Sequence, residues 1–347
     1  MDILHKTDAH KAALEAALGD LPFPSVDADR PVELLKRCPV AAVTPLEASP
    51  ELADRAGVSA VHVKDERGRM GLGSFKALGA AYVIARDAEQ GKASGQTYVT
   101  ASAGNHGLSV AAGAQVFGAT AVVFLAETVP ESFAERLREF GADVRREGAI
   151  YEDAMAAAEV YAEADGFVLL SDSSWPGYFE RPHTLMEGYL TLMQEAVSQM
   201  PEPPSHIFLQ AGVGGLAASC AAYARKTWGE GPRIVVVEPE VAPALYASIK
   251  AGAPQITTGA SSDMGRLDCK EPSLIALKGL ASDADDFMLI SEDEGAQGSA
   301  VCAEVGLPTT PSGAAGVAGL LAAQARPADL GLTPQSRALV ILSEEAG

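Results

Sequence analysis

The chain has 347 residues, 48% of them hydrophobic, so it can bury a large core and form two lobes. Its formal net charge of −20 repels nucleic acid and anionic lipid, which argues against both as partners. No apolar run reaches the roughly 20 residues of a membrane helix, and the polar N-terminus predicts no signal peptide.

The four cysteines are scattered along the chain, at Cys38, Cys220, Cys269 and Cys302. They form no CxxC pair and no cluster with histidine, so we expect free thiols in a reducing compartment and no metal site. A cytoplasmic protein is therefore predicted.

The first 44 residues are expected to form a helical arm and then a proline-rich extended segment. A short helix is predicted over 50–55. Val61 and Val63 alternate with polar residues, which predicts a strand over 60–64.

A glycine-rich loop leads from this strand to Lys76. Ser74 precedes a run with helical apolar spacing and is predicted to cap that helix, which places Lys76 in its first turn. The positive end of a helix repels an ammonium group, so this position favours a lysine that is neutral or bound as an imine. A surface lysine whose stem lies along the helix is the simpler alternative.

The segment from about 80 to 180 alternates between helices and strands. Strands are predicted over 97–100, 121–125, 143–146 and 167–170, and helices over 107–117, 131–140 and 151–164. Strands joined by single helices indicate parallel crossovers and a doubly wound sheet. We interpret residues 80–181 as a lobe inserted within a larger one.

The same rhythm resumes after residue 185. The predicted elements are helix 186–199, strand 206–210, a helix after the glycines at 212–215, strand 233–238, helices 294–305 and 313–324, and strand 338–342. Residues 250–285 show little regular pattern and are expected to form a long loop.

A glycine-rich turn at Gly212-Val213-Gly214-Gly215 lies between a predicted strand and helix. Successive glycines let backbone N–H groups converge near the positive helix end, which favours a phosphate site. A tight strand–helix turn is one alternative. A dinucleotide site is another, although Ala217 or Ala218 would have to replace its last glycine.

Two further motifs follow strands. Ser102-Ala103-Gly104-Asn105-His106 begins a helix, where unpaired N–H groups can bind an anion; an ordinary turn with a helix cap is the alternative. Ser343 ends the last strand and is otherwise read as a turn residue.

These four motifs, in the order Lys76, 102–106, 212–215 and Ser343, resemble the fold-type II pyridoxal-phosphate enzymes, the threonine dehydratase and tryptophan synthase β group. The resemblance runs from about residue 45 to the C-terminus. It implies an α/β fold of two lobes, each a mostly parallel twisted sheet flanked by helices, with pyridoxal 5′-phosphate in the cleft between them. Residues 1–79 and 182–347 would form the large cofactor-binding domain, and 80–181 the small substrate-binding domain.

The resemblance also implies roles for individual residues. Lys76 would hold the cofactor as an imine beside Phe75, and Ser343 would bond the pyridine nitrogen. Asn105 would bond the 3′ oxygen, and the phosphate would lie against Gly212, Val213, Gly214, Gly215 and Leu216. The substrate carboxylate would lie against Ser102, Ala103, Gly104 and His106.

Three stretches resemble the 2,3-diaminopropionate ammonia-lyases more narrowly: 64–76, 172–178 and 267–272. Those enzymes carry an aspartate before Gly-Asn-His as a second base for the D-substrate, whereas this chain has Ala103. We therefore expect Lys76 to remove the Cα proton from one face only, that of an L-amino acid.

Asp172 is a second candidate catalytic residue. Its carboxylate could bind a β-ammonium group or, if burial raises its pKa, protonate a leaving group; a turn-forming aspartate is the alternative. Arg266 and Lys270 could favour a substrate with a second anion, or belong to a solvated loop.

The resulting hypothesis is an α,β-eliminating ammonia-lyase that releases a 2-oxo acid and ammonia, and the family implies a homodimer. A β-hydroxy amino acid dehydratase is the first alternative, because the loop at 102–106 is dehydratase-like. A non-catalytic cofactor- or nucleotide-binding protein is an alternative of another class.

Overall fold

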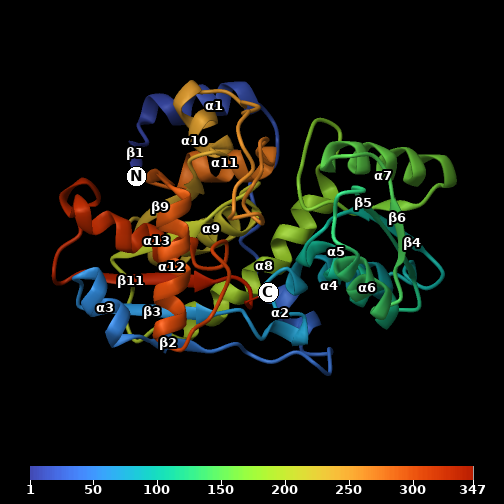
Figure 1. Cartoon of the computed structure of the whole chain (residues 1–347), viewed down its shortest axis with the longest axis horizontal. Coiled ribbons are helices and arrows are strands. Elements are labelled where there is room, and N and C mark those ends of the chain that lie inside the picture. Colours follow the sequence, from blue (N-terminus) through green and yellow to red (C-terminus); the bar gives the residue numbers. More distant parts are fainter. Residues whose placement is uncertain (347) are drawn as a thin grey trace.

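The computed structural model describes residues 1–346, whose strands form two sheets (Figure 1). The larger sheet has the strand order β1-β10-β9-β8-β11-β3-β2. Its strands are β1 (Asp2–His5), β2 (Leu46–Ala48), β3 (Ala60–Asp65), β8 (His206–Gln210), β9 (Arg233–Pro239), β10 (Asp286–Ile290) and β11 (Arg337–Leu342). The inner strands run parallel, and the edge strands β1 and β2 pair antiparallel.

Helices cover both faces of this sheet. Successive side chains of a strand point to opposite faces, so Ile207 and Leu209 of β8 join one apolar cluster and Phe208 joins another. The first cluster includes α1 (Asp8–Leu18), α8 (Glu180–Gln199), α9 (Gly215–Trp228), α10 (Ala244–Ala251) and α11 (Leu274–Asp283). The second includes α3 (Pro50–Ala56), α12 (Glu292–Glu304) and α13 (Ala315–Ala322). Burial on both faces explains the continuous apolar runs of the central strands.

The smaller sheet has the order β6-β5-β4-β7, with all its strands parallel. They are β4 (Thr97–Ala101), β5 (Thr120–Leu125), β6 (Asp143–Arg146) and β7 (Val168–Leu169). Val99 and Val122 face α7 (Tyr151–Asp165). Tyr98 and Val123 face the other side, which is covered by α4 (Ala77–Glu89), α5 (Asn105–Val116) and α6 (Glu131–Glu139).

The predicted α/β fold of two mostly parallel sheets is confirmed. In Figure 1 the smaller sheet lies beside the larger one, and α8 packs against both α4 and α9. The domain limits stay a prediction; those at 79/80 and 181/182 fall inside α4 and α8.

The expectation of an unbroken loop over 250–285 is wrong, because α11 occupies 274–283. Its sequence is apolar on nearly every side, so it lacks the polar face that marks an amphipathic helix. The strands β1, β2 and β10 and the helices α2 (Asp29–Leu35) and α10 also went unpredicted. No helix within residues 1–346 has the length and apolar character to cross a membrane.

Candidate active site

A loop with three left-handed residues connects β3 to Lys76. It contains a short 3₁₀ turn, Arg69–Gly71, and φ is 52° at Met70, 70° at Gly71 and 74° at Gly73. Met70 is the only residue other than glycine with such a φ in residues 1–346. Glycine adopts this region without a side-chain clash, which explains the two glycines.

The last strand holds the end of this loop. The Ser74 hydroxyl donates to the Ser343 carbonyl at 3.0 Å, and the Phe75 N–H donates to the same oxygen at 3.1 Å. The Glu345 N–H donates to the Gly73 carbonyl at 2.9 Å. Backbone hydrogen bonds therefore fix the residues on either side of Ser74 before α4 begins.

Ser74 does not cap α4 as predicted. The helix begins at Ala77, and Lys76 occupies the position before it without a side-chain cap from the described residues. The Ser74 hydroxyl accepts from the Lys76 N–H at 3.3 Å while it donates to Ser343. Lys76 thus lies just before the first turn rather than in it, still at the positive end of the helix.

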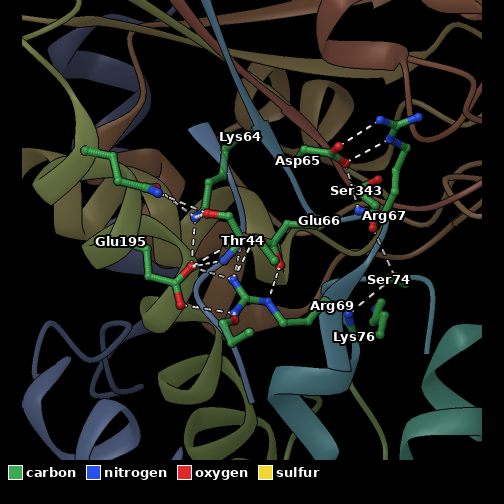
Figure 2. A network of polar contacts seen from close by, with 12 residues as sticks. Thr44, Lys64, Asp65, Glu66, Arg67, Arg69, Ser74, Lys76, Glu195 and Ser343 are labelled. Carbon is green, nitrogen blue, oxygen red and sulfur yellow. Dashed lines mark hydrogen bonds and ion pairs between the residues drawn. The ribbon is translucent and has the colours of Figure 1, made fainter. Parts of the chain in front are cut away.

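A buried network of charged side chains holds the start of the loop (Figure 2). The Arg69 guanidinium donates to Glu66 and Glu195, each at 2.7 Å, and to the Thr44 hydroxyl at 2.8 Å. Lys64 Nζ donates to Glu195 and to the Thr44 carbonyl, also at 2.7 Å. Two cations and two anions make the network neutral, so each buried charge has a partner.

Lys76 and Asp172 form an ion pair at the end of the loop. Burial alone would lower the pKa of Lys76, but the Asp172 carboxylate outweighs it and raises that pKa above its usual value. Burial alone would raise the pKa of Asp172, but the Lys76 ammonium lowers it below the usual range. The neutral lysine and the raised Asp172 pKa considered from the sequence are therefore not found, because each group is the counter-ion of the other.

The glycine-rich turn lies next to this ion pair. The Tyr189 ring packs edge-on against Phe75, with ring centroids 4.9 Å apart, and its centroid is 5.9 Å from Lys76 Nζ. A side chain built at Gly215 would begin 3.6 Å from the Tyr189 ring and 4.0 Å from the Asp172 carbonyl. One small molecule can therefore contact both the amine and the turn.

The turn between β8 and α9 packs closely against the segment 266–269, which requires glycine at position 212. Gly214 has a φ of 99°, and a Cβ at Gly212 would lie 2.9 Å from the Cys269 sulfur. The N–H groups of Gly212 and Gly214 have no acceptor in residues 1–346. Val213 belongs to the turn, and Leu216 lies in the first turn of α9. The N–H groups of a first helical turn lack intrahelical acceptors. This arrangement can bind a phosphate.

The loop between β4 and α5 begins that helix at Asn105. The Ser102 hydroxyl accepts from the N–H groups of Gly104 and Gly107 at 3.2 and 3.1 Å, so it also serves the local turn. The His106 ring bonds the Leu170 carbonyl at 2.8 Å, close in sequence to Asp172. Burial lowers the pKa of His106, which keeps the ring neutral.

Glu344 joins this loop to the last strand and was not among the predicted site residues. It is 5% exposed, accepts from the Asn105 amide at 2.5 Å, and also bonds the Thr310 hydroxyl. Arg266 Nη1 donates to the Ala103 carbonyl at 2.9 Å, and its Nε lies 3.7 Å from Glu344. The only sequence signal for a role of Glu344 at the site is its position next to Ser343.

Comparison with known proteins defines the class. Residues 39–344 match the family described as "Pyridoxal-phosphate dependent enzyme". The chain is 35% identical over 296 residues to the diaminopropionate ammonia-lyase of Salmonella typhimurium, covering 77% of this chain and 73% of that one. It is 30% identical over 296 residues to the biosynthetic L-threonine dehydratase of Pasteurella multocida, covering 81% and 52%. The chain therefore belongs to the family of pyridoxal-phosphate dependent enzymes.

Solved structures give the same result. The crystal structure of diaminopropionate ammonia-lyase from Escherichia coli, in complex with an aminoacrylate-PLP azomethine intermediate, superposes with a TM-score of 0.88 at 28% identity. It covers 99% of this chain and 93% of that chain. The predicted fold-type II family and its cofactor, pyridoxal 5′-phosphate, are thus confirmed. The residues present fit the cofactor, because the Lys76 amine lies beside a turn with unpaired N–H groups.

Substitution of Glu195 by glutamine tests the buried network. Burial alone would raise the pKa of Glu195, but Arg69 and Lys64 lower it, so this carboxylate stabilises the fold above the usual carboxyl pKa and less as the pH falls through its lowered value. We expect Glu195→Gln to lower the free energy of unfolding by about 3–5 kcal/mol at neutral pH, measured in urea.

Glu230→Gln is the matched control, because the Glu230 side chain is 88% exposed. It should change the free energy of unfolding by no more than about 0.5 kcal/mol. Equal effects of the two substitutions would contradict the account of the network.

Proposed function

We propose that this enzyme releases ammonia from L-2,3-diaminopropionate, with the Asp172 carboxylate as the group that selects the β-ammonium. The chain is a pyridoxal-phosphate dependent enzyme of α,β-elimination. The reaction consumes one water and gives pyruvate and two molecules of ammonia. The observation that carries the choice of substrate is the ion pair of Asp172 with the Lys76 amine.

The bound cofactor supplies an electron sink for the pair of electrons left at Cα. Lys76 would attach the cofactor and, once its amine is free, take the Cα proton. Asp172 would hold the cationic β-substituent on the same side of the site. The remaining assignments are those expected from the family: Phe75, Asn105, Gly212, Val213, Gly214, Gly215, Leu216 and Ser343 at the cofactor, and Ser102, Ala103, Gly104 and His106 at the substrate carboxylate.

Charge favours an ammonium leaving group over a hydroxyl. The Lys76 ammonium lowers the pKa of Asp172, so the Asp172 carboxylate is ionised while a cation lies beside it and then only accepts hydrogen bonds. The Asp172 side chain is 20% exposed, and a carboxylate largely withdrawn from water needs a cationic partner. When the Lys76 amine is engaged with the cofactor, a β-ammonium supplies one. A neutral β-hydroxyl does not.

Lys270 and Arg266, the two cations considered from the sequence, do not favour a second substrate anion. Lys270 Nζ donates to the carbonyls of Val241 and Ala260 and to Asp268, at 2.7–2.9 Å. Arg266 is bound to the Ala103 carbonyl and lies near Glu344. Both cations already interact with carbonyl oxygens and a carboxylate of this chain. This supports a substrate with a single carboxylate.

Dehydration of a β-hydroxy amino acid is the second candidate. It is favoured by the loop Ser102-Ala103-Gly104-Asn105-His106 and by the similarity to an L-threonine dehydratase. The two reactions share every step except the leaving group, so the substrate distinguishes them.

The setting of the enzyme is inferred separately. The resemblance implies a homodimer, which sedimentation of the purified chain would test. The four cysteines form no disulfide in the described structure, which is compatible with a reducing compartment such as the cytoplasm. The acidic surface speaks against a nucleic-acid partner.

Asp172→Asn tests the selecting group. We expect kcat/KM for L-2,3-diaminopropionate to fall about 10- to 100-fold relative to kcat/KM for L-threonine, because the amide oxygen still accepts a hydrogen bond but no longer carries the negative charge that pairs with the β-ammonium. The ratio of the two values removes any common effect on Lys76. An equal loss for both substrates would contradict the assignment.

Ala103→Asp tests the expected L-selectivity. The wild-type enzyme should act on L-diaminopropionate at least about 100-fold faster than on the D-isomer, because only Lys76 is available as a base. The substitution should raise activity on the D-isomer, measured as ammonia release. Ala103→Asn, of similar size but without a base, is the control and should leave that activity unchanged.

A further inference from the structure

We propose that Glu344 is a positioning residue that fixes the amide orientation of Asn105, so that the amide presents an N–H donor to the 3′ oxygen of the cofactor. The inference deepens the proposed function and rests on it, because it requires pyridoxal phosphate at Lys76. The family resemblance implies the contact of Asn105 with the 3′ oxygen, and the new element is the part played by Glu344.

The chemistry of the amide makes such a device necessary. The side chain of Asn105 carries two N–H donors on one arm and an acceptor oxygen on the other, and rotation by half a turn exchanges them. The ionised 3′ oxygen of the cofactor accepts hydrogen bonds, so only one of the two orientations is useful. Glu344 Oε2 is an acceptor and takes one of the two N–H groups at 2.5 Å, which fixes the nitrogen arm of the amide toward Glu344. The second N–H remains for another acceptor.

Glu344 is itself held in place from several directions. The Thr310 hydroxyl donates to its other carboxylate oxygen, and the Thr309 hydroxyl donates to its backbone carbonyl. The Gly313 Cα lies so close that a Cβ there would be 3.2 Å from the Glu344 side chain. Buried at 5% exposure, the carboxylate has little freedom to turn away from Asn105.

Arg266 completes the arrangement and joins it to the loop at 102–105. Its guanidinium lies 3.7 Å from Glu344, donates to the Ala103 carbonyl at 2.9 Å, and lies over the Phe133 ring at 5.9 Å. It therefore contacts α6, the loop before α5 and Glu344, the second residue after β11. The Arg266 charge compensates the buried Glu344 carboxylate. The bond to the Ala103 carbonyl fixes the backbone two residues before Asn105.

Glu344→Gln tests the proposal in the holoenzyme. Glutamine keeps the size of the side chain but can also donate, so it can pair with either orientation of the Asn105 amide. A second hydrogen bond donated to the 3′ oxygen weakens the bond between that oxygen and the imine N–H. The pKa of the imine is therefore lower when the Asn105 amide donates, and higher when it does not. We expect the midpoint of the pH titration of the cofactor absorbance band to rise by about one unit in Glu344→Gln. Glu345→Gln, a change in a half-exposed neighbour, should leave the midpoint unchanged.

A double-substitution cycle separates positioning from a general structural effect. Asn105→Ala should raise the midpoint by itself, and Glu344→Gln should then add nothing, because its effect passes through Asn105. A shift of the same size in the Asn105→Ala background, or no shift in Glu344→Gln alone, would overturn the proposal.

If Glu344→Gln does not fold, Thr310→Val frees one carboxylate oxygen of Glu344 and should raise the midpoint by a smaller amount; no rise there would overturn it as well. A wild-type chain without any cofactor band would instead contradict the proposed function.

Discussion

The site depends on a loop that is fixed at both ends by different means. At its start, the fully buried Arg69 is bound by Glu66 and Glu195 within a neutral set of charges. At its end, the Ser343 carbonyl accepts from both Ser74 and Phe75. Between these two anchors the backbone passes through three left-handed residues, of which only Met70 is not a glycine. The position of the Lys76 amine follows from this constraint.

The amine then meets groups from both parts of the molecule. Asp172 comes from the segment after β7 of the smaller sheet, whereas the glycine-rich turn follows β8 of the larger sheet. In a doubly wound fold the carboxyl ends of parallel strands are where ligands bind, because helix N-termini gather there. The loops after β3, β4, β8 and β11 all leave such ends, which explains how four motifs far apart in sequence come together at the candidate site.

Much of this arrangement could be predicted from the sequence. The strand at 206–210 was predicted with the bounds observed, because an apolar run ends at a glycine turn there. The strand β10 and the helix α11 could not be recognised, since burial on all sides removes their periodicity. Ser74 was misassigned as a cap because its bond to Ser343 joins residues 269 positions apart. Pairs such as Arg69–Glu195 and Asn105–Glu344 are likewise formed only by tertiary structure.

The central claim is that the Lys76 amine carries the cofactor beside the glycine-rich turn. The most direct measurement is reduction of the purified holoenzyme with borohydride, followed by proteolysis and mass spectrometry of the peptides. The account predicts a phosphopyridoxyl group on the peptide that contains Lys76, and on no other lysine. An adduct on a different lysine, or an unmodified Lys76 after saturation with pyridoxal phosphate, would contradict it.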